Sequence, residues 1–456
     1  MGIRLDNLCR AVRDMQYAVR GPIVARAQEL ERQGRQVIYC NIGNPQALAQ
    51  RPLTWVRQVL ALAEYPEVLE RAPGAFPADA VEAARTIARE SGSGLGAYTE
   101  SKGFLFVRQA VARFIQERDG IPSDPEAIYL TDGASKAAQA VLRLLIAGEK
   151  DGILIPVPQY PLYSATLTLF GGAPIPYQTD ERADWGLSRQ ALEEAVAGAA
   201  ARGVKARAIV VINPGNPTGA VLSEKDVGMV LDFARQHDLA ILADEVYQEN
   251  VWRAGDRFVS FAGAQARRGD REVALFSFHS TSKGFLGECG HRGGYVECRN
   301  VPADVLEELT KHQSVALCSN SVGQIVTYLM VRPPRAGEPS FAVYDRERRE
   351  IQDSLRRRAA IVERGLNAVE GIRCNPVAGA MYAFPRIQLP PGVTDGQWCL
   401  ALLEETGICV VPGSGFGQAD GTWHFRTTIL PPLDQIETVV GRIAEFHRKF
   451  LSRPQK

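Results

Sequence analysis

The segment 277–284, Ser-Phe-His-Ser-Thr-Ser-Lys-Gly, places a lysine directly after a group of small hydroxyl residues. The apolar run 273–278 is typical of a buried strand, so Lys283 would lie at the end of that strand, where α/β proteins bind ligands. A deprotonated lysine amine held in such a place is a nucleophile that can form a Schiff base. Taken alone, the segment more often marks a surface lysine that follows a core strand.

Four further apolar runs also end in small, polar or aromatic residues. These runs, each with the residues that follow it, are 127–131 with Asp132 to Ser135, 152–157 with Tyr160 and Tyr163, 208–212 with Asn216, and 240–243 with Asp244 and Tyr247. Each group alone has an ordinary explanation, such as a helix cap for Asp244 or a turn for Asn216. The free N–H groups of a helix that starts near Ser135 would equally suit a phosphate.

The order of these elements predicts the architecture that positions such residues. Continuous apolar strands alternate with helical segments, which favours an α/β fold with a mainly parallel sheet covered on both faces. The proline-rich segment 332–339 is a plausible domain boundary. The arginine-rich stretch 346–358 has apolar residues at helical spacing, and short strand-like pieces follow it, which predicts a smaller α+β domain. We expect an N-terminal arm with the first part of the small domain at 1–75, a large domain at 76–332, and a small domain at 333–456.

Composition excludes several classes of function. The 456 residues contain 52 basic and 52 acidic side chains, which argues against a nucleic-acid binder that works by neutralising phosphates. Eight cysteines form no C-x-x-C pair and six histidines have no metal-ligand spacing, so we expect neither a disulfide framework nor a metal. No apolar leader or membrane-spanning run is present, and we therefore expect a soluble cytoplasmic protein that does not bind membranes.

Taken together, these motifs resemble those of a known family. The succession of Asn-Pro-x-Asn-Pro-Thr-Gly at 213–219, Ala-Asp-Glu-Val-Tyr at 243–247, Ser-x-x-Lys at 280–283 and a late Arg426 resembles the class I (fold type I) pyridoxal-phosphate-dependent aminotransferases. Longer pieces, such as 17–23, 155–165, 287–295, 375–382 and 405–417, are similar to the alanine aminotransferase branch. The resemblance runs from about Arg13 to His447, and it implies an aspartate aminotransferase-like fold with a seven-stranded sheet between helices. The Gly-Asn-Pro at 43–45 leaves the exact amino-acid preference open.

The resemblance also implies roles for individual residues. Lys283 would bind pyridoxal 5'-phosphate as a Schiff base and act as the catalytic residue, and Asp244 would pair with the pyridine nitrogen. The remaining implied cofactor contacts are Asn216 and Tyr247 at the phenolic oxygen, Tyr160 on the ring face, Ala134, Ser135, Ser280, Ser282 and Arg292 at the phosphate, and Tyr98 from the neighbouring subunit of a homodimer. The implied substrate contacts are Arg426 at the α-carboxylate, with Gly43 and Asn216 beside it.

The implied reaction is a ping-pong amino transfer through pyridoxamine phosphate. L-alanine and 2-oxoglutarate would give pyruvate and L-glutamate. Within the same fold, the alternatives are an aminotransferase for another small amino acid or for glyoxylate, and a pyridoxal-phosphate lyase. The Ser-x-x-Lys at 280–283 also occurs in serine β-lactamases, but their K-T-G and S-D-N motifs are absent. A transcriptional regulator on this fold would need an added DNA-binding module, and residues 1–40 are too short for one.

Overall fold

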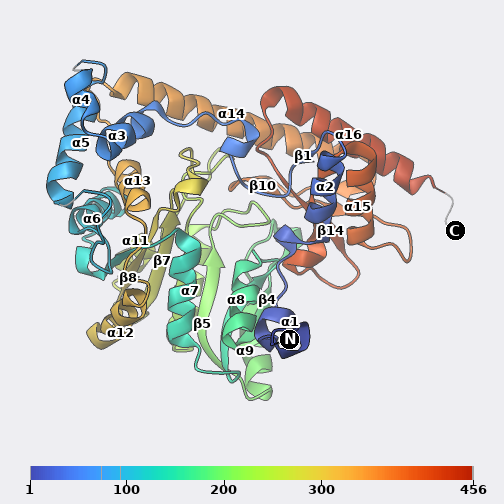
Figure 1. The fold of residues 1–456 in the computed structure, drawn as a ribbon. Coiled ribbons are helices and arrows are strands. Elements are labelled where there is room, and N and C mark those ends of the chain that lie inside the picture. The colour runs from blue at the N-terminus through green and yellow to red at the C-terminus, as the bar shows by residue number, and fades with distance from the viewer. Residues whose placement is uncertain (1, 73, 93, 454–456) are drawn as a thin grey trace.

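The computed structural model describes residues 2–72, 74–92 and 94–453, and its centre is a seven-stranded sheet (Figure 1). In spatial order the strands are β2 (Ile128–Leu130), β8 (Gly294–Arg299), β7 (Leu275–Ser280), β6 (Ala240–Asp244), β5 (Lys205–Ile212), β3 (Asp151–Val157) and β4 (Ala173–Gln178). The neighbours from β7 to β4 pair in parallel, and β8 pairs antiparallel with both β7 and β2. The prediction of a mainly parallel, seven-stranded sheet is therefore confirmed.

Helices cover both faces of this sheet, because the side chains of each strand alternate between them. Val210 packs beneath one set of helices and the adjacent Val211 beneath the other. The first set is α7 (Ala134–Leu145), α8 (Leu162–Phe170) and α12 (Ala303–Ser314). The second set is α9 (Arg189–Ala201), α10 (Glu224–Gln236) and α11 (Phe261–Arg267).

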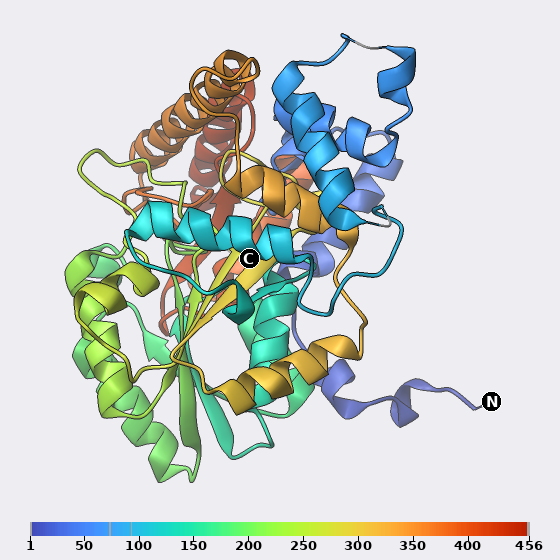
Figure 2. The same cartoon turned by 90° about the vertical axis from the view of Figure 1, so that its left-hand side faces the viewer.

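A further group of helices shares one hydrophobic cluster with β2 and β8 (Figure 2). Its members are α3 (Thr54–Glu64), α5 (Ala78–Ser91), α6 (Leu105–Asp119) and α13 (Ser321–Val331), with the short α4 (Val68–Arg71) beside them. Since Ile128, Leu130 and Tyr295 belong to this cluster, the helices extend the core beyond the edge of the sheet.

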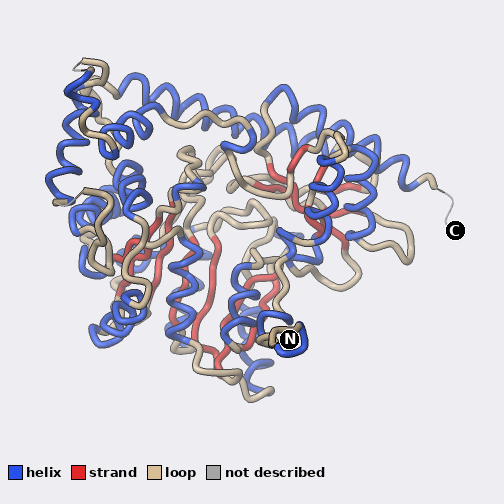
Figure 3. The backbone as a smooth tube through the Cα atoms, viewed as in Figure 1, coloured by secondary structure: helices blue, strands red, loops and turns tan. Residues whose placement is uncertain are grey.

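The smaller part of the molecule is a second α+β unit, as expected (Figure 3). Its strands are β9 (Ile372–Arg373), β10 (Tyr382–Ala383), β11 (Arg386–Ile387), β13 (Val411–Pro412) and β14 (Trp423–Thr428), with the parallel pair β1 (Ile38–Tyr39) and β12 (Ile408–Cys409). Its helices are α2 (Pro22–Arg32), α14 (Phe341–Asn367), α15 (Asp395–Thr406) and α16 (Leu433–Leu451). Because β1 pairs with β12, an N-terminal segment completes a structure built mostly from the C-terminal third of the chain.

Short helices connect these elements. They are η1 (Leu5–Asn7), α1 (Arg10–Asp14), η2 (Ala18–Arg20), η3 (Gln46–Leu48), η4 (Pro125–Ala127), η5 (Glu181–Ala183), η6 (Cys289–His291) and η7 (Gly413–Phe416). Gly21 separates η2 from α2, which begins at Pro22.

The long helix α14 joins the two parts of the molecule. Tyr344 at its start belongs to the cluster of α3, α5, α6 and α13, whereas Leu355 and Val362 belong to the core of the smaller part. Ile351 packs against both clusters. The arginine-rich stretch 346–358 thus lies on an amphipathic helix, as predicted, while the proposed division into domains stays a prediction. No helix within the described ranges has the length and apolar character needed to cross a membrane.

Candidate active site

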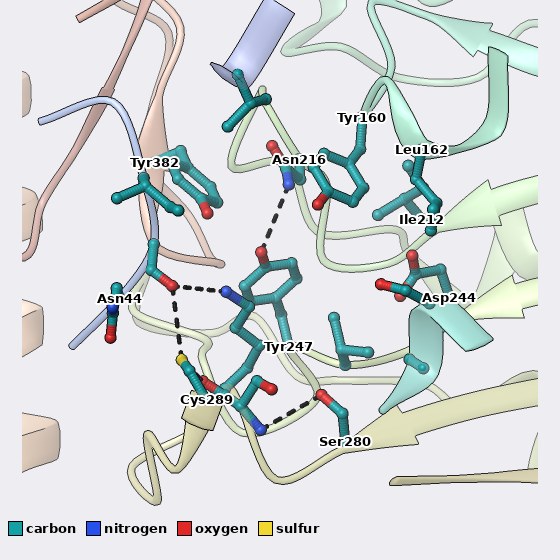
Figure 4. A pocket seen from close by; sticks show the side chains of 18 of the residues that line it. Asn44, Tyr160, Leu162, Ile212, Asn216, Asp244, Tyr247, Ser280, Cys289 and Tyr382 are labelled. Atoms are coloured by element: carbon teal, nitrogen blue, oxygen red, sulfur yellow. Dashed lines mark hydrogen bonds between the residues drawn. The ribbon is translucent and has the colours of Figure 1, made fainter. Parts of the chain in front are cut away.

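The carboxyl ends of the central strands open into a cavity of about 410 Å³, which residues of the smaller part also line. Every residue that the sequence analysis assigned to the site lines this cavity, with the exception of Tyr98. These lining residues are Gly43, Ala134, Ser135, Tyr160, Asn216, Asp244, Tyr247, Ser280, Ser282, Lys283, Arg292 and Arg426. Figure 4 shows how Tyr160, Asn216, Asp244, Tyr247 and Ser280 surround it. The structure therefore brings together segments that are up to 383 positions apart in the chain, from Gly43 to Arg426.

Two adjacent carboxylates at the end of β6 point to opposite faces of the sheet. Asp244 faces α8 and the cavity, and its Oδ2 accepts a hydrogen bond of 2.8 Å from the hydroxyl of Tyr163. Glu245 faces the other side, where its two oxygens accept from the Ser277 hydroxyl at 2.5 Å and from the Phe261 amide at 2.8 Å. Asp244 alone of this pair is therefore available to a ligand.

The second oxygen of Asp244, Oδ1, is buried and has no hydrogen-bond partner among the described residues. Burial raises the pKa of Asp244 to about 6, although the Tyr163 hydroxyl, the Val246 amide and the charge of Lys283 oppose this shift. A buried carboxylate oxygen without a donor is costly, and an N–H group placed in the cavity would remove that cost.

The amine of Lys283 reaches across the cavity to the smaller part. Its Nζ donates to the carbonyl oxygen of Gly43 at 2.7 Å and lies 5.8 Å from the centre of the Tyr247 ring. The thiol of Cys289 donates to the same carbonyl at 3.8 Å. A side chain at Gly43 would collide with the hydroxyl of Tyr382, so only glycine leaves the space around the amine open.

An anion-binding cradle lies at the N-terminus of α7. Gly133 precedes this 12-residue helix with a φ of 80°, and no side chain caps the first N–H groups. The guanidinium of Arg292 lies against Gly133, where it donates to the Asp132 carbonyl at 3.0 Å and to the Ser282 hydroxyl at 3.4 Å. Helix dipole, free N–H groups and guanidinium together suit a phosphate.

Arg426 is a buried guanidinium, only 1% exposed, that stands within β14 rather than after it. Its two terminal nitrogens donate to the Asn216 side chain at 3.0 Å and to the Asn41 carbonyl. The rings of Tyr382 and Phe416 flank it, with centres 4.2 and 4.6 Å from the guanidinium carbon. Among the described residues no carboxylate pairs with its charge, and its Nε has no acceptor. The carboxylate of a bound substrate would supply both the opposite charge and the missing acceptor.

A hydrogen-bonded chain connects Arg426 to the other wall of the cavity. The side chain of Asn216 accepts from Arg426, and its amide nitrogen lies 3.5 Å from the hydroxyl of Tyr247, to which it donates. On the neighbouring wall, the hydroxyls of Tyr160 and Tyr17 are 2.7 Å apart. Burial raises the pKa of Tyr160 and of Tyr247 well above the usual value, so both phenols remain neutral hydrogen-bonding groups.

Several lining residues were missed by the sequence analysis. Tyr382, Tyr17, Arg20 and Cys289 line the cavity, and Tyr163 supports Asp244 from behind. Burial raises the pKa of the Tyr382 phenol, but the nearby charges of Lys283 and Arg426 outweigh burial and lower this pKa below its usual value. The signal in the sequence was that these residues lie in family-like segments, with Tyr17 and Arg20 in 17–23, Cys289 in 287–295 and Tyr382 at the end of 375–382, but no site role was assigned to them.

These features fit pyridoxal phosphate, the cofactor implied by the sequence motifs. Lys283 offers the amine for a Schiff base, the free Oδ1 of Asp244 suits a protonated pyridine nitrogen, and the start of α7 with Arg292 suits the phosphate. Metal chemistry has no comparable support, because the described residues contain no cluster of three or more His, Cys, Asp and Glu side chains.

Tyr98 lies outside the cavity of its own chain and is 79% exposed. The loop that contains it is tied to α13, since the Ser321 hydroxyl donates to the Leu95 carbonyl. Val315 and Leu317, which precede α13, are 86% and 51% exposed. The segment of Val315 and Leu317 leads to Asn320, whose amide donates to the Asp132 side chain at 2.8 Å, and the Asp132 carbonyl accepts from Arg292 of the phosphate cradle.

Comparisons with known proteins agree with this geometry. The family model of aminotransferase class I and II matches residues 70–443. The chain is 46% identical over 477 residues to a probable mitochondrial alanine aminotransferase of Dictyostelium discoideum, with 98% of this chain and 89% of the relative covered. It is 47% identical over 463 residues to glutamate–glyoxylate aminotransferase 1 of Arabidopsis thaliana, with 98% and 96% covered. The crystal structure of an aspartate aminotransferase from Rhizobium meliloti, 23% identical, matches with a TM-score of 0.77 over 98% of this chain and 100% of that chain, which confirms the fold class.

The expectation of a cytoplasmic location is contradicted by these relatives. The Dictyostelium discoideum protein and alanine aminotransferases 1 and 2 of Arabidopsis thaliana are all named mitochondrial. The physical reason for the error is that an absent apolar leader argues only against secretion and membrane insertion.

Proposed function

Because the chain belongs to the aminotransferase class I and II family, we propose that it transfers the amino group of L-alanine to 2-oxoglutarate, giving pyruvate and L-glutamate. The observation that carries this proposal is the composition of one cavity. It contains the lysine amine of Lys283, a carboxylate oxygen of Asp244 without a donor, and the buried, unpaired guanidinium of Arg426. The name of the alanine aminotransferase relative, 46% identical, supports alanine as the donor.

Bound pyridoxal phosphate supplies an electron-withdrawing ring that accepts the electron pair released when the substrate Cα–H bond breaks. Tyr163 fixes the Asp244 carboxylate through Oδ2, and the free Oδ1 would hold the proton of the pyridine nitrogen. The Lys283 amine, once free, would take the proton from the substrate Cα and later give a proton back, so that it serves as base and then as acid.

Arg426 and Asn216 orient the substrate. Arg426 offers two parallel N–H groups to the α-carboxylate, and the rings of Tyr382 and Phe416 keep its guanidinium plane fixed. Asn216 and Tyr247, which are hydrogen-bonded to each other, would hold the phenolic oxygen of the cofactor, and Tyr160 would cover its ring. Ser135, Ser280, Ser282 and Arg292, with the Ala134 amide, would hold the phosphate.

A second candidate is amino transfer from glutamate to glyoxylate. It is favoured by the 47% identity to a relative named glutamate–glyoxylate aminotransferase. Both candidates use the same amine, carboxylate and guanidinium, so only substrate preference separates them.

A substrate panel tests the proposal. Alanine, glutamate and valine are each paired with 2-oxoglutarate, pyruvate and glyoxylate, and kcat/KM is measured with the cofactor-loaded enzyme. We expect alanine with 2-oxoglutarate to be the best forward pair, with parallel-line kinetics. A clear preference for glutamate with glyoxylate would favour the second candidate. Steady release of pyruvate and ammonia without any oxo acid would indicate a lyase and contradict both.

We also propose that the active enzyme is a homodimer in which Tyr98 reaches the phosphate end of the neighbouring site. The high exposure of Tyr98, and of Val315 and Leu317 before Asn320, which is connected to the cradle through Asp132 and Arg292, supports this arrangement. In a mixture of Tyr98→Ala and Lys283→Ala chains, one site per mixed dimer would contain both native residues. Activity above that of either variant alone is expected, and activity no higher than their average, with mixed dimers present, would contradict the shared site.

A further inference from the structure

Four cationic side chains line the active-site cavity, and the proposed function assigns only three of them. Lys283 provides the amine, Arg292 contacts the phosphate cradle, and Arg426 awaits the α-carboxylate. The fourth is Arg20, in η2. Against these four cations the lining contains a single carboxylate, that of Asp244 at the inner wall, so the charge of Arg20 has no counterpart in the cavity.

The backbone around Arg20 is fixed although its side chain is exposed. The Tyr17 carbonyl accepts from the Arg20 amide at 3.1 Å, and the Tyr17 hydroxyl is 2.7 Å from that of Tyr160. Val19 is 4% exposed and packs in the cluster that contains Phe384 and Phe416. The guanidinium itself makes no hydrogen bond or ion pair with any residue that the structure describes.

Arg20 stands where two cavities meet. It also lines a second cavity, again of about 410 Å³, that shares Val19, Ile42 and Asn44 with the first. The carboxylate that lines this second cavity, Glu31, accepts a hydrogen bond from the Tyr39 hydroxyl at 3.0 Å. Arg20 is therefore an exposed residue shared by the active-site cavity and its neighbour, with an uncommitted guanidinium.

We propose that Arg20 binds the distal carboxylate of the five-carbon dicarboxylic substrate, a proposal that rests on the proposed function. Alanine and pyruvate present one carboxylate, which Arg426 satisfies. Glutamate and 2-oxoglutarate present a second one that extends away from the reacting carbon, toward the opening. A planar guanidinium can bind it through two parallel hydrogen bonds, which makes Arg20 a specificity-determining residue for the second half-reaction only.

Half-reactions measured separately test this role. The absorbance change of the cofactor-loaded enzyme is followed after mixing with alanine alone or with glutamate alone, in the native protein and in Arg20→Met. We expect the apparent affinity for glutamate to fall about tenfold in the variant, as for the loss of one charge-assisted contact, with a much smaller change for alanine. Arg20→Lys should recover part of the loss, and Arg202→Met, at an exposed arginine after α9, should change neither.

A binding measurement without turnover completes the test. Glutarate and pentanoate have the same chain length but two and one carboxylates, and their dissociation constants are measured by calorimetry with the loaded enzyme. The native protein should prefer glutarate about tenfold, a preference that Arg20→Met removes and that high salt weakens. An unchanged preference in Arg20→Met, or equal losses for alanine and glutamate, would overturn the assignment of Arg20. Failure of the native enzyme to react with alanine at all would instead refute the proposed function.

Discussion

The hydroxyl of Tyr163 donates to Oδ2 of Asp244 at 2.8 Å, across the contact between α8 and the end of β6. This bond occupies one oxygen of the carboxylate and turns the other, Oδ1, toward the cavity without a partner. Two opposing influences therefore act on one side chain, since burial raises the pKa of Asp244 to about 6 while the Tyr163 hydroxyl opposes the rise. The first two predictions separate these influences.

Replacing Tyr163 by phenylalanine removes the hydrogen bond and keeps the ring. The pKa of Asp244 should then rise above about 6, and the carboxylate should hold the cofactor less firmly. We expect cofactor affinity to fall roughly ten- to a hundredfold, the range for a hydrogen bond to a charged group, as measured by equilibrium dialysis. Tyr177→Phe is the matched control, because the buried Tyr177 hydroxyl donates at 2.8 Å to the Val210 carbonyl, away from the site. Equal losses in both variants would contradict a specific role for Tyr163.

Replacing Asp244 by asparagine should stabilise the cofactor-free protein at high pH while it weakens cofactor binding. The pKa of Asp244 in the folded protein, about 6, lies above its usual 3.8, so the folded state holds the proton more tightly than the unfolded state does. Native stability should therefore fall as the pH rises from about 4 to 6, by up to about 3 kcal/mol. Urea unfolding at pH 4 and pH 8 measures this difference, which should be smaller in Asp244→Asn by the Asp244 contribution, while Glu245 and Glu249, whose pKa values burial raises to about 7, still titrate in this range. Asp420→Asn, at an exposed aspartate, serves as the control. A native protein that is more stable than Asp244→Asn at pH 8 would refute the assignment of this pH dependence to Asp244.

Replacing Lys283 by alanine should remove catalysis without unfolding the protein. The variant loses the amine that binds the cofactor and moves the proton, so we expect turnover of alanine to fall by at least about 10⁴-fold. Circular dichroism should remain native, because the Lys283 amine makes only one hydrogen bond, to Gly43. Lys225→Ala, at an exposed lysine of α10, should retain full activity. Pyruvate formation at the native rate in Lys283→Ala would eliminate the proposed mechanism.

A methyl group at Gly43 tests the shape of the cavity. Its Cβ would overlap the Tyr382 hydroxyl and lie 3.2 Å from the Lys283 amine, so Tyr382 must move away from Arg426. We expect kcat/KM for alanine to fall roughly a hundredfold, the scale of a misplacement near the reacting atoms. Gly148→Ala, where a Cβ meets nothing within 4 Å, should behave like the native enzyme. Native kinetics in Gly43→Ala would show that this contact does not shape the site.

The large-domain strands that the sequence revealed are the ones buried on both faces. Two strands of the central sheet lacked that apolar signature. The segment 173–178 contains two prolines, which are tolerated because β4 is an edge strand that pairs only with β3. β8 contains the buried Glu297, whose charge is compensated by the Arg299 guanidinium at 2.9 Å and the Ser123 hydroxyl at 2.6 Å. A local sequence pattern shows neither the edge position of β4 nor the partners of Glu297, because both depend on residues that are distant in the chain.

The candidate site was predictable where a residue follows a strand and belongs to a family motif in which it has an implied role. Asp244 and Lys283 have both properties. Tyr163 and Arg20 lie in the family-like segments 155–165 and 17–23 but had no implied role there, since Tyr163 acts through another side chain and Arg20 reaches the cavity from an N-terminal turn. Tyr382 was part of a recognised motif, but its place between Gly43 and Arg426 depends on how the smaller part packs against the sheet. Tyr98 remains a prediction, because its expected contact would involve a second chain.

Asp244 and Glu245, at the end of β6, face opposite sides of the sheet, so an insertion or deletion within this strand would exchange the sides that they face. Asp244 and Glu245 differ by one methylene, and their functions are separated only by which side of the sheet each faces. Deleting one residue upstream within β6 would deliver glutamate to the cofactor side and aspartate to the Ser277 side. Composition would be almost unchanged, yet both carboxylates would be misplaced. At this position the register of the strand, which decides the carboxylate that faces the cavity, matters more for function than the choice between aspartate and glutamate.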